Sequence, residues 1–201
     1  MVRNKSALGI IFPNNYDGLV PELTSIRSMA SIPFASRYRL IDFVLSSMVD
    51  AGIDNISVLA QANYRSLMDH LGSGKEWDLH RKRDGLFILP PFVTHDNTGV
   101  YKGTVDAIRS CTGYIKRSSQ RYVVLTGSHT IYNSAYTDMI EQHIATGADI
   151  TIMYNVETPD YDSQNYDDLR LEIDDETGRI KDLALNPEKP KSFNCSCDAF
   201  N

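Results

Sequence analysis

The fold of this chain is decided near its start by the apolar run Ala7-Leu8-Gly9-Ile10-Ile11-Phe12 and the loop Pro13-Asn14-Asn15-Tyr16-Asp17-Gly18-Leu19. A short, continuously apolar run is typical of a strand buried on both faces of a parallel sheet. The loop after such a strand is a common phosphate site, because glycines there let backbone N–H groups approach a ligand closely. This loop contains one glycine and no cation. It therefore has the position of a phosphate loop without the usual chemistry of one.

The rest of the chain alternates apolar runs with helical patterns. The apolar runs are Ile56–Leu59, Tyr122–Leu125 and Ile150–Tyr154, and an excursion over residues 73–100 that breaks the alternation is expected to carry one strand around Phe87–Leu89. The helical patterns cover Ile41–Ala51, Asn63–Leu71, Val105–Ser118 and Ala135–Thr146. This order predicts an α/β fold with an open, mostly parallel, doubly wound sheet. A hairpin is expected at the margin of this sheet, with strands Leu169–Ile173 and Arg179–Leu185 around the turn Asp174–Gly178.

Composition narrows the classes of partner and location. The net charge of −6 and the pI near 5.3 argue against a nucleic-acid partner, which would need a basic face. No apolar run approaches the roughly 20 residues of a membrane helix, and no signal peptide is recognised, so we expect no membrane contact and a cytoplasmic location. The basic cluster His80-Arg81-Lys82-Arg83 is interpreted first as a solvated loop and second as an anion or partner contact. Cys195 and Cys197 give only a weak metal signal, and free thiols are expected.

Several short patterns occur in a specific order along the chain. They are Thr24-x-x-Arg27, Ile32-Pro33-Phe34, Tyr38-Arg39-x-Ile41-Asp42-Phe43, Gln61 after the second strand, and Tyr101-x-Gly103-Thr104-x-Asp106-Ala107 at a helix start. Over essentially the whole chain, this ordered set resembles the N-terminal part of ADP-glucose pyrophosphorylase (glucose-1-phosphate adenylyltransferase). The resemblance implies a Rossmann-like nucleotidyltransferase domain, of which residues 1–201 are the N-terminal part. It also implies a left-handed β-helix domain that this chain does not contain.

The reaction that the resemblance implies joins ATP and glucose 1-phosphate into ADP-glucose and pyrophosphate with Mg²⁺, for glycogen or starch synthesis. Phosphoryl-type chemistry depends on positioning and charge neutralisation. In an ungapped register, however, the family's Gly-Gly-x-Gly-x-Arg-Leu loop falls on residues 14–20. Its three glycines become Asn14, Asn15 and Asp17, and its arginine becomes Leu19.

Three further family positions carry residues that do not fit their roles. The lysine of a Lys-Pro-Ala segment falls on Met29, an apolar side chain that cannot neutralise a phosphate. The metal-binding aspartate falls on His129, or on Ser128 if the register shifts by one residue, and neither supplies the carboxylate that suits Mg²⁺. The sugar-binding Glu-Lys-Pro segment falls on residues 185–187, where Asn186 replaces the lysine. The literal triplet Glu188-Lys189-Pro190 lies three residues later and is interpreted as exposed and structural, or as the motif displaced by a small insertion.

Other family positions keep suitable residues. Gln61 suits a hydrogen bond to a base edge, and Gly103 and Thr104 suit close approach of a nucleotide at a helix start. The candidates for phosphate or effector binding are Arg27, Arg37 and Arg39, of which Arg37 stands where the family usually has a lysine. For Arg39, a structural ion pair with Asp42 is an equal alternative.

The combination predicts a catalytically deficient regulatory-type (D-type) subunit that acts on a catalytic homologous subunit in a heterotetramer. No catalytic residue, metal site or bound cofactor is expected in this chain, and Mg²⁺ would serve the family reaction. One alternative is an active nucleotidyltransferase that uses Glu188 and Lys189. Another is a sensor that binds ATP or a sugar phosphate without turnover.

Overall fold

The computed structural model describes residues 6–13, 20–91, 101, 103–131, 136–156, 169–185 and 195–196. The chain divides into two compact units, one that ends at Gln142 and one that begins at His143. The helix α6 (Tyr136–Thr146) spans this boundary in the sequence. Several predicted site positions lie outside the described residues, namely Asn14, Asn15, Asp17, Leu19, Asn186, Glu188 and Lys189.

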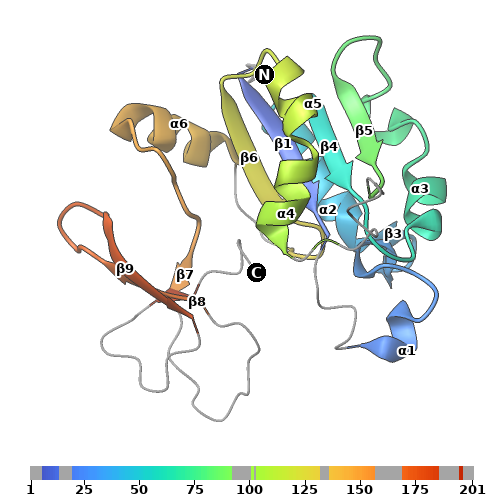
Figure 1. Ribbon diagram of the computed structural model, residues 1–201, viewed down its shortest axis with the longest axis horizontal. Helices are drawn as coiled ribbons and strands as arrows, with labels where there is room; N and C mark the ends of the chain where they lie inside the picture. Colours follow the sequence, from blue (N-terminus) through green and yellow to red (C-terminus); the bar gives the residue numbers. More distant parts are fainter. Residues whose placement is uncertain are drawn as a thin grey trace. The chain divides into compact units, whose positions relative to one another are not determined.

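The first unit contains the predicted parallel sheet. Its strand order is β5 (Gly85–Leu89), β4 (Asn55–Leu59), β1 (Ala7–Phe12) and β6 (Tyr122–Gly127), and all three pairings are parallel (Figure 1). From β1 the chain proceeds through β4 to β5 on one side and then returns to place β6 on the other side. This reversal puts a topological switch point at the carboxyl ends of β1 and β6, where open α/β sheets bind ligands.

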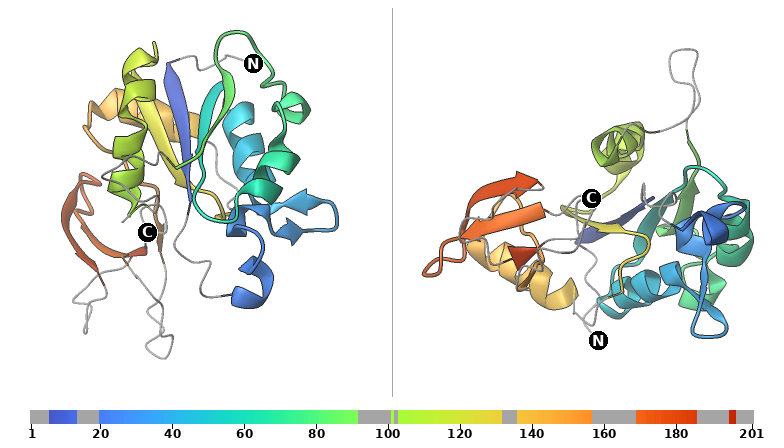
Figure 2. Two further views of the ribbon diagram at one scale, coloured as in Figure 1. Left: turned by 45° about the vertical axis from the view of Figure 1, so that its right-hand side comes forward. Right: turned by 90° about the horizontal axis from the view of Figure 1, so that it is seen from below.

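Helices cover both faces of this sheet, as a doubly wound fold requires. The views in Figure 2 place α2 (Leu40–Asp50) and α3 (Arg65–Leu71) on one face, and α4 (Thr104–Ser110) and α5 (Thr112–Arg117) on the other. The single helix predicted over 105–118 is present as two helices, α4 and α5. They are separated at Cys111, whose N–H bonds the carbonyl of Ile108, three residues back, and so tightens the turn.

The central strand β1 packs against both helical layers. Side chains alternate along a strand, so its even-numbered residues join the cluster under α4 and α5. On the other face, a Cβ atom on Gly9 would lie 2.7 Å from Sδ of Met48 on α2. Glycine at this position therefore lets α2 pack closely on the sheet. The even-face cluster contains Leu8, Ile10, Phe12, Leu59, Tyr101, Ala107 and Cys111.

Short elements that the sequence did not predict lie between β1 and α2. They are α1 (Pro21–Thr24), the 3₁₀ helix η2 (Met29–Ser31), and a hairpin of β2 (Pro33–Phe34) and β3 (Tyr38–Arg39). A further 3₁₀ helix, η3 (Lys75–Trp77), follows α3. In the turn of the hairpin, Ala35 and Ser36 have φ values of 48° and 76°, which are uncommon for residues other than glycine.

The second unit contains a separate antiparallel sheet. Its order is β7 (Asn155–Val156), β10 (Cys195–Ser196), β8 (Leu169–Ile173) and β9 (Ile180–Leu185). The predicted hairpin is present as β8 and β9, but it belongs to this sheet and not to the margin of the parallel sheet.

The predicted strand Ile150–Tyr154 is wrong, because residues 150–154 form no strand. A buried strand needs neighbours on both faces, and here Ile150 is 71% exposed and Tyr154 is 45% exposed. Pairing begins only at Asn155, which lies opposite Ser196.

None of the helices in the described ranges combines the length and the apolar character that crossing a membrane demands.

Candidate functional site

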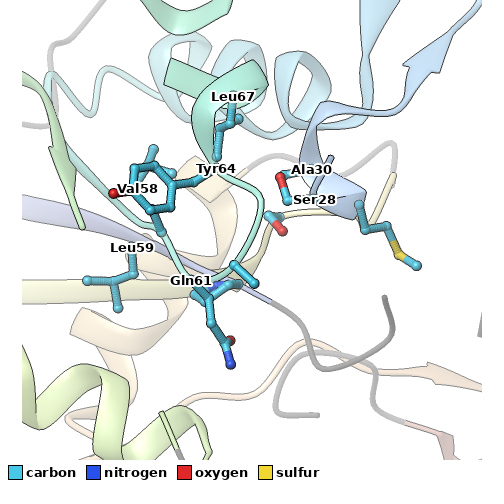
Figure 3. Close-up of a pocket in the computed structure, with 12 residues that line it drawn as sticks. Ser28, Ala30, Val58, Leu59, Gln61, Tyr64 and Leu67 are labelled. Atoms are coloured by element: carbon cyan, nitrogen blue, oxygen red, sulfur yellow. The ribbon is translucent and has the colours of Figure 1, made fainter. Parts of the chain in front are cut away.

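A cavity of about 210 Å³ lies where β1 and β4 end (Figure 3). Pro13 follows β1, Ala60 follows β4 and Ser128 follows β6, so all three strand ends contribute to its lining. Because parallel strands bring their carboxyl ends to one edge, this is the edge at which a ligand is expected. The lining residues are Pro13, Ser28, Met29, Ala30, Val58, Leu59, Ala60, Gln61, Ala62, Tyr64, Leu67 and Ser128.

The cavity has two walls that are joined at Asn63. One wall is η2 with Ser28, and the other is the segment from Gln61 to Leu67 that leads from β4 into α3 (Figure 3). The backbone N–H of Ser28 donates to the carbonyl of Asn63 at 3.3 Å, and Nδ2 of Asn63 donates to the carbonyl of Thr24 at 3.2 Å. The φ of Asn63 is 50°, a left-handed conformation that asparagine tolerates better than most residues. Asn63 therefore fixes the spacing of the two walls.

The chemistry of the lining is neutral. None of the twelve described lining residues is charged, and its hydrogen-bonding side chains are those of Ser28, Gln61, Tyr64 and Ser128. Such a surface accepts an uncharged polar or planar group through an amide and hydroxyls. It supplies no cation for a triphosphate and no carboxylate for a metal ion.

The predicted lysine and metal positions can now be placed. Met29, the expected lysine position, is half-buried and lines the cavity. Of the two candidates for the metal position, Ser128 is buried and lines the cavity, whereas the next residue, His129, is not part of the lining. Across the described ranges, no cluster of three or more His, Cys, Asp or Glu residues can hold a metal ion. These residues therefore do not fit Mg²⁺.

The retained nucleotide positions are not all brought together. Gln61 lines the cavity directly beyond β4, but Gly103 and Thr104 do not contribute to it. Gly103 precedes α4 with φ 169°, an extended conformation open to any residue. No described atom lies within 4 Å of a Cβ built on it, so neither backbone geometry nor packing requires glycine there.

The three candidate arginines occupy different environments, and none of them lines the cavity. Arg27 is half-buried, and within the described ranges its guanidinium makes no hydrogen bond or ion pair. The guanidinium of Arg37 lies over the ring of Tyr38, 5.3 Å from its centre. Nη1 of Arg39 donates to the carbonyl of Ser66 at 2.6 Å and to Oγ of Ser66 at 2.9 Å.

The ion pair between Arg39 and Asp42, one of the two alternatives for Arg39, is wrong, because each side chain has other partners. Oδ2 of Asp42 accepts the backbone N–H of Arg39 at 2.9 Å, and Oδ1 lies 2.6 Å from Nε2 of His70. The carboxylate is short and sits three residues into α2, so it caps its own helix and cannot follow the guanidinium to Ser66. Both residues nevertheless have structural contacts, as the alternative interpretation proposed.

The basic cluster is anchored by one of its members. Nη1 of Arg81 lies 2.6 Å from Oδ2 of Asp54, and Nη2 lies 2.9 Å from Oδ2 of Asp78. The other three residues of the cluster are exposed, in agreement with a solvated loop.

Sequence reasoning missed Ser28 and Tyr64 as lining residues. Tyr64 follows Gln61 in the connection from β4 to α3, so its place after a strand end was the available signal. Ser28 carried no comparable signal, because its position depends on the unpredicted helix η2.

Comparisons with known proteins agree with this geometry. The model of the nucleotidyl transferase family matches residues 19–197. The glycogen biosynthesis protein GlgD of Bacillus subtilis is 44% identical over 154 residues, which cover 75% of this chain and 44% of that protein. The GlgD protein of Geobacillus stearothermophilus is 43% identical over 152 residues, covering 74% and 43%. The glucose-1-phosphate adenylyltransferase of Thermotoga neapolitana is 38% identical over 171 residues, covering 85% and 39%.

The matched region thus spans less than half the length of each of these relatives. The matches confirm the resemblance inferred from the ordered motifs, and the parallel sheet confirms the predicted Rossmann-like fold. The chain therefore belongs to the nucleotidyl transferase family.

Proposed function

We propose that this chain belongs to a catalytically deficient regulatory subunit of glucose-1-phosphate adenylyltransferase that functions in glycogen biosynthesis. It would associate with a catalytic homologous subunit, in a heterotetramer, and change the activity or effector response of that subunit. Mg²⁺ and the two substrates would then be handled by the partner.

The observation that carries the proposal is the neutral lining of the cavity at the strand ends. Phosphoryl-type transfer requires cations and a metal to neutralise charge, and the described lining offers Met29 and Ser128 at the corresponding positions. The similarity to the glycogen biosynthesis proteins GlgD of two bacteria, and to a glucose-1-phosphate adenylyltransferase, supports the part of the proposal that concerns glycogen biosynthesis.

A second candidate is a sensor that binds ATP or a sugar phosphate without turnover. Gln61 favours it, because an amide at the end of β4 beside apolar walls suits the edge and faces of a base. This candidate is compatible with a regulatory subunit, since ligand binding would be a way to regulate the partner.

The test is to purify the full-length protein, the catalytic homologue from the same organism, and their mixture. ADP-glucose formation from ATP and glucose 1-phosphate is then measured with Mg²⁺. We expect negligible turnover by the protein alone, and a mixture whose rate or effector response differs from that of the homologue alone. Turnover by the isolated protein at the rate of the homologue would refute the proposal and support an active nucleotidyltransferase.

Calorimetric titration of the isolated protein with ATP and with glucose 1-phosphate tests the sensor. Binding that Gln61→Leu weakens, while the exposed substitution Met68→Leu leaves it unchanged, would support the sensor. If neither ligand binds, the sensor is excluded and the subunit role depends on protein contacts alone.

A further inference from the structure

The wall of the cavity that contains Gln61 ends in a helix too short to be stable alone. α3 has seven residues, about two turns, and isolated helices of that length are marginal in water. Its contact with the core comes from Leu67 and Leu71, which are buried on one face, four residues apart. Two leucines on one face limit the tilt of the helix less well than contacts at both ends would.

The first end of α3 is held by Arg39. Its Nη1 atom bonds both the carbonyl and the hydroxyl of Ser66, the second residue of the helix. A charged donor bonded to two oxygens of one residue fixes direction as well as distance. Ser66 lies between the lining residues Tyr64 and Leu67, so this contact fixes the part of the wall where α3 begins.

The last turn of α3 is held by Asp42. One carboxylate oxygen accepts the N–H of Arg39 at the start of α2, and the other lies 2.6 Å from Nε2 of His70 on α3. Asp42 is 6% exposed, so water screens this contact little. The ring of His70 also packs edge-on to Trp77, with ring centres 6.1 Å apart.

We propose that Arg39 and Asp42 are positioning residues that set the shape of the cavity by holding α3 at both ends. Neither side chain lines the cavity, so each acts through the helix and not on a ligand. Arg39 was a candidate for phosphate or effector binding, and its contacts with Ser66 assign it this different role. An effect of these residues on ligand affinity rests on the proposed binding of a ligand in the cavity. Their effect on the position of α3 does not.

The structural consequence is tested by hydrogen exchange of the full-length protein, with mass-spectrometric readout of peptides over residues 61–71. In Arg39→Lys, we expect exchange in this segment to rise by about tenfold, because the lysine side chain is one bond shorter and its ammonium lacks the rigid planar geometry with which Nη1 bonds both oxygens of Ser66. Ser66→Ala should have a smaller effect, because the carbonyl contact remains. Ser66→Thr keeps the hydroxyl and should restore wild-type exchange.

Arg65→Lys is the matched control. Arg65 is the neighbouring residue on the same helix, is exposed, and makes no hydrogen bond or ion pair within the described ranges. Its replacement should leave exchange unchanged. A rise spread evenly over β4 and α2 in Arg39→Lys would show general destabilisation and overturn the proposal, and so would no rise at all.

The ligand consequence is tested by calorimetry with ATP as the probe. If ATP binds the wild-type protein, Arg39→Lys should weaken binding by about tenfold and Arg65→Lys should not. Equal affinities of all three proteins would overturn the positioning role even if exchange had changed. If ATP does not bind the wild-type protein, the ligand-binding function fails, and the exchange result alone decides whether Arg39 positions α3.

Discussion

Replacing Gly9 by alanine tests how closely α2 packs on the strand that leads to the cavity. The new Cβ would lie 2.7 Å from Sδ of Met48 and 3.3 Å from Cγ1 of Ile56. Non-bonded carbon atoms are at their optimum roughly 3.5–4.0 Å apart, so the methyl group would be about 1 Å too close to the sulfur. Met48 is fully buried, which leaves its side chain little room to move away.

The magnitude follows from two opposing effects. Overpacking a filled core costs about 1–3 kcal/mol. Loss of conformational freedom in the unfolded chain returns about 0.4–1 kcal/mol, because the backbone of Gly9 does not need a positive φ. We therefore expect Gly9→Ala to lower the free energy of unfolding by roughly 1–2 kcal/mol.

A double-mutant cycle with Met48→Ala identifies the cause. Met48→Ala alone should cost about 2–5 kcal/mol through the cavity that it leaves. In the double mutant the clash is gone, and the methyl group introduced by Gly9→Ala fills part of that cavity. The double mutant should therefore lose less free energy of unfolding than the two single mutants together, by about 1–3 kcal/mol.

Urea unfolding followed by the fluorescence of Trp77 is the assay, because this is the only tryptophan of the chain and it lies in the first unit. Gly113→Ala is the control, since Gly113 is an exposed residue of α5 with no described atom within 4 Å of its Cβ position. It should stabilise the protein by about 0.5–1 kcal/mol. Additivity of Gly9→Ala and Met48→Ala within about 0.5 kcal/mol would refute the close-packing argument.

Three further changes test the site and the second unit. Met29→Lys would place a cation in the neutral lining of the cavity and should tighten ATP binding by about tenfold in calorimetry. The control Met68→Lys, on the exposed side of α3, should leave the affinity unchanged. Equal affinities of the two variants for ATP would contradict the assignment of the site. The hydrogen bond from Lys181, followed by the backbone N–H of Thr177, lowers the pKa of Asp174 from 3.8 to about 2, so its contribution to stability is complete above pH 3.8 and is lost as the pH falls toward 2. NMR titration should show that Lys181→Met raises this pKa part of the way back, and an unchanged pKa would exclude Lys181 as the main cause. Burial raises the pKa of the Cys111 thiol, so site-resolved labelling at pH 8 should be more than about tenfold slower in the folded protein than in urea, and equal rates would show that the thiol is accessible.

The parallel sheet could be predicted because its strands carry their signal locally. β1 coincides with the predicted run, and β4 and β6 differ from their predictions by one or two residues at one end. The run at Ile150 has the same apolar character, but a strand also needs a partner, and the sequence does not record where partners lie. The β2–β3 hairpin was missed for a related reason, because Ala35 and Ser36 adopt positive φ values without the glycine or asparagine that usually marks such a turn.

The site was predictable in its position but not in its contacts. Gln61, which was named from its match to a family position, lines the cavity, and its place directly after β4 agrees with the rule that ligands bind at the carboxyl ends of parallel strands. The roles of the three arginines could not be told apart from their charge, because the partner of each guanidinium depends on which part of the folded chain lies next to it. The guanidinium of Arg39 meets Ser66, which is 27 residues away in the sequence, and that of Arg37 meets its neighbour Tyr38.

Two charged residues that contact the wall of the cavity, Arg39 and Asp42, are directed into the scaffold. Arg39 bonds the start of α3 and Asp42 contacts the end of α3, so a cation and an anion hold the wall and do not line the cavity. Asn63 joins that wall to Ser28 at the start of η2, and the described lining residues are neutral in charge. A transferase site needs the opposite arrangement, with charges turned toward the reacting phosphates. A cavity whose described lining has fixed walls and no charged side chain is better suited to recognising a ligand, or to keeping a surface in shape for a partner, and this is the physical argument behind the regulatory role that we propose.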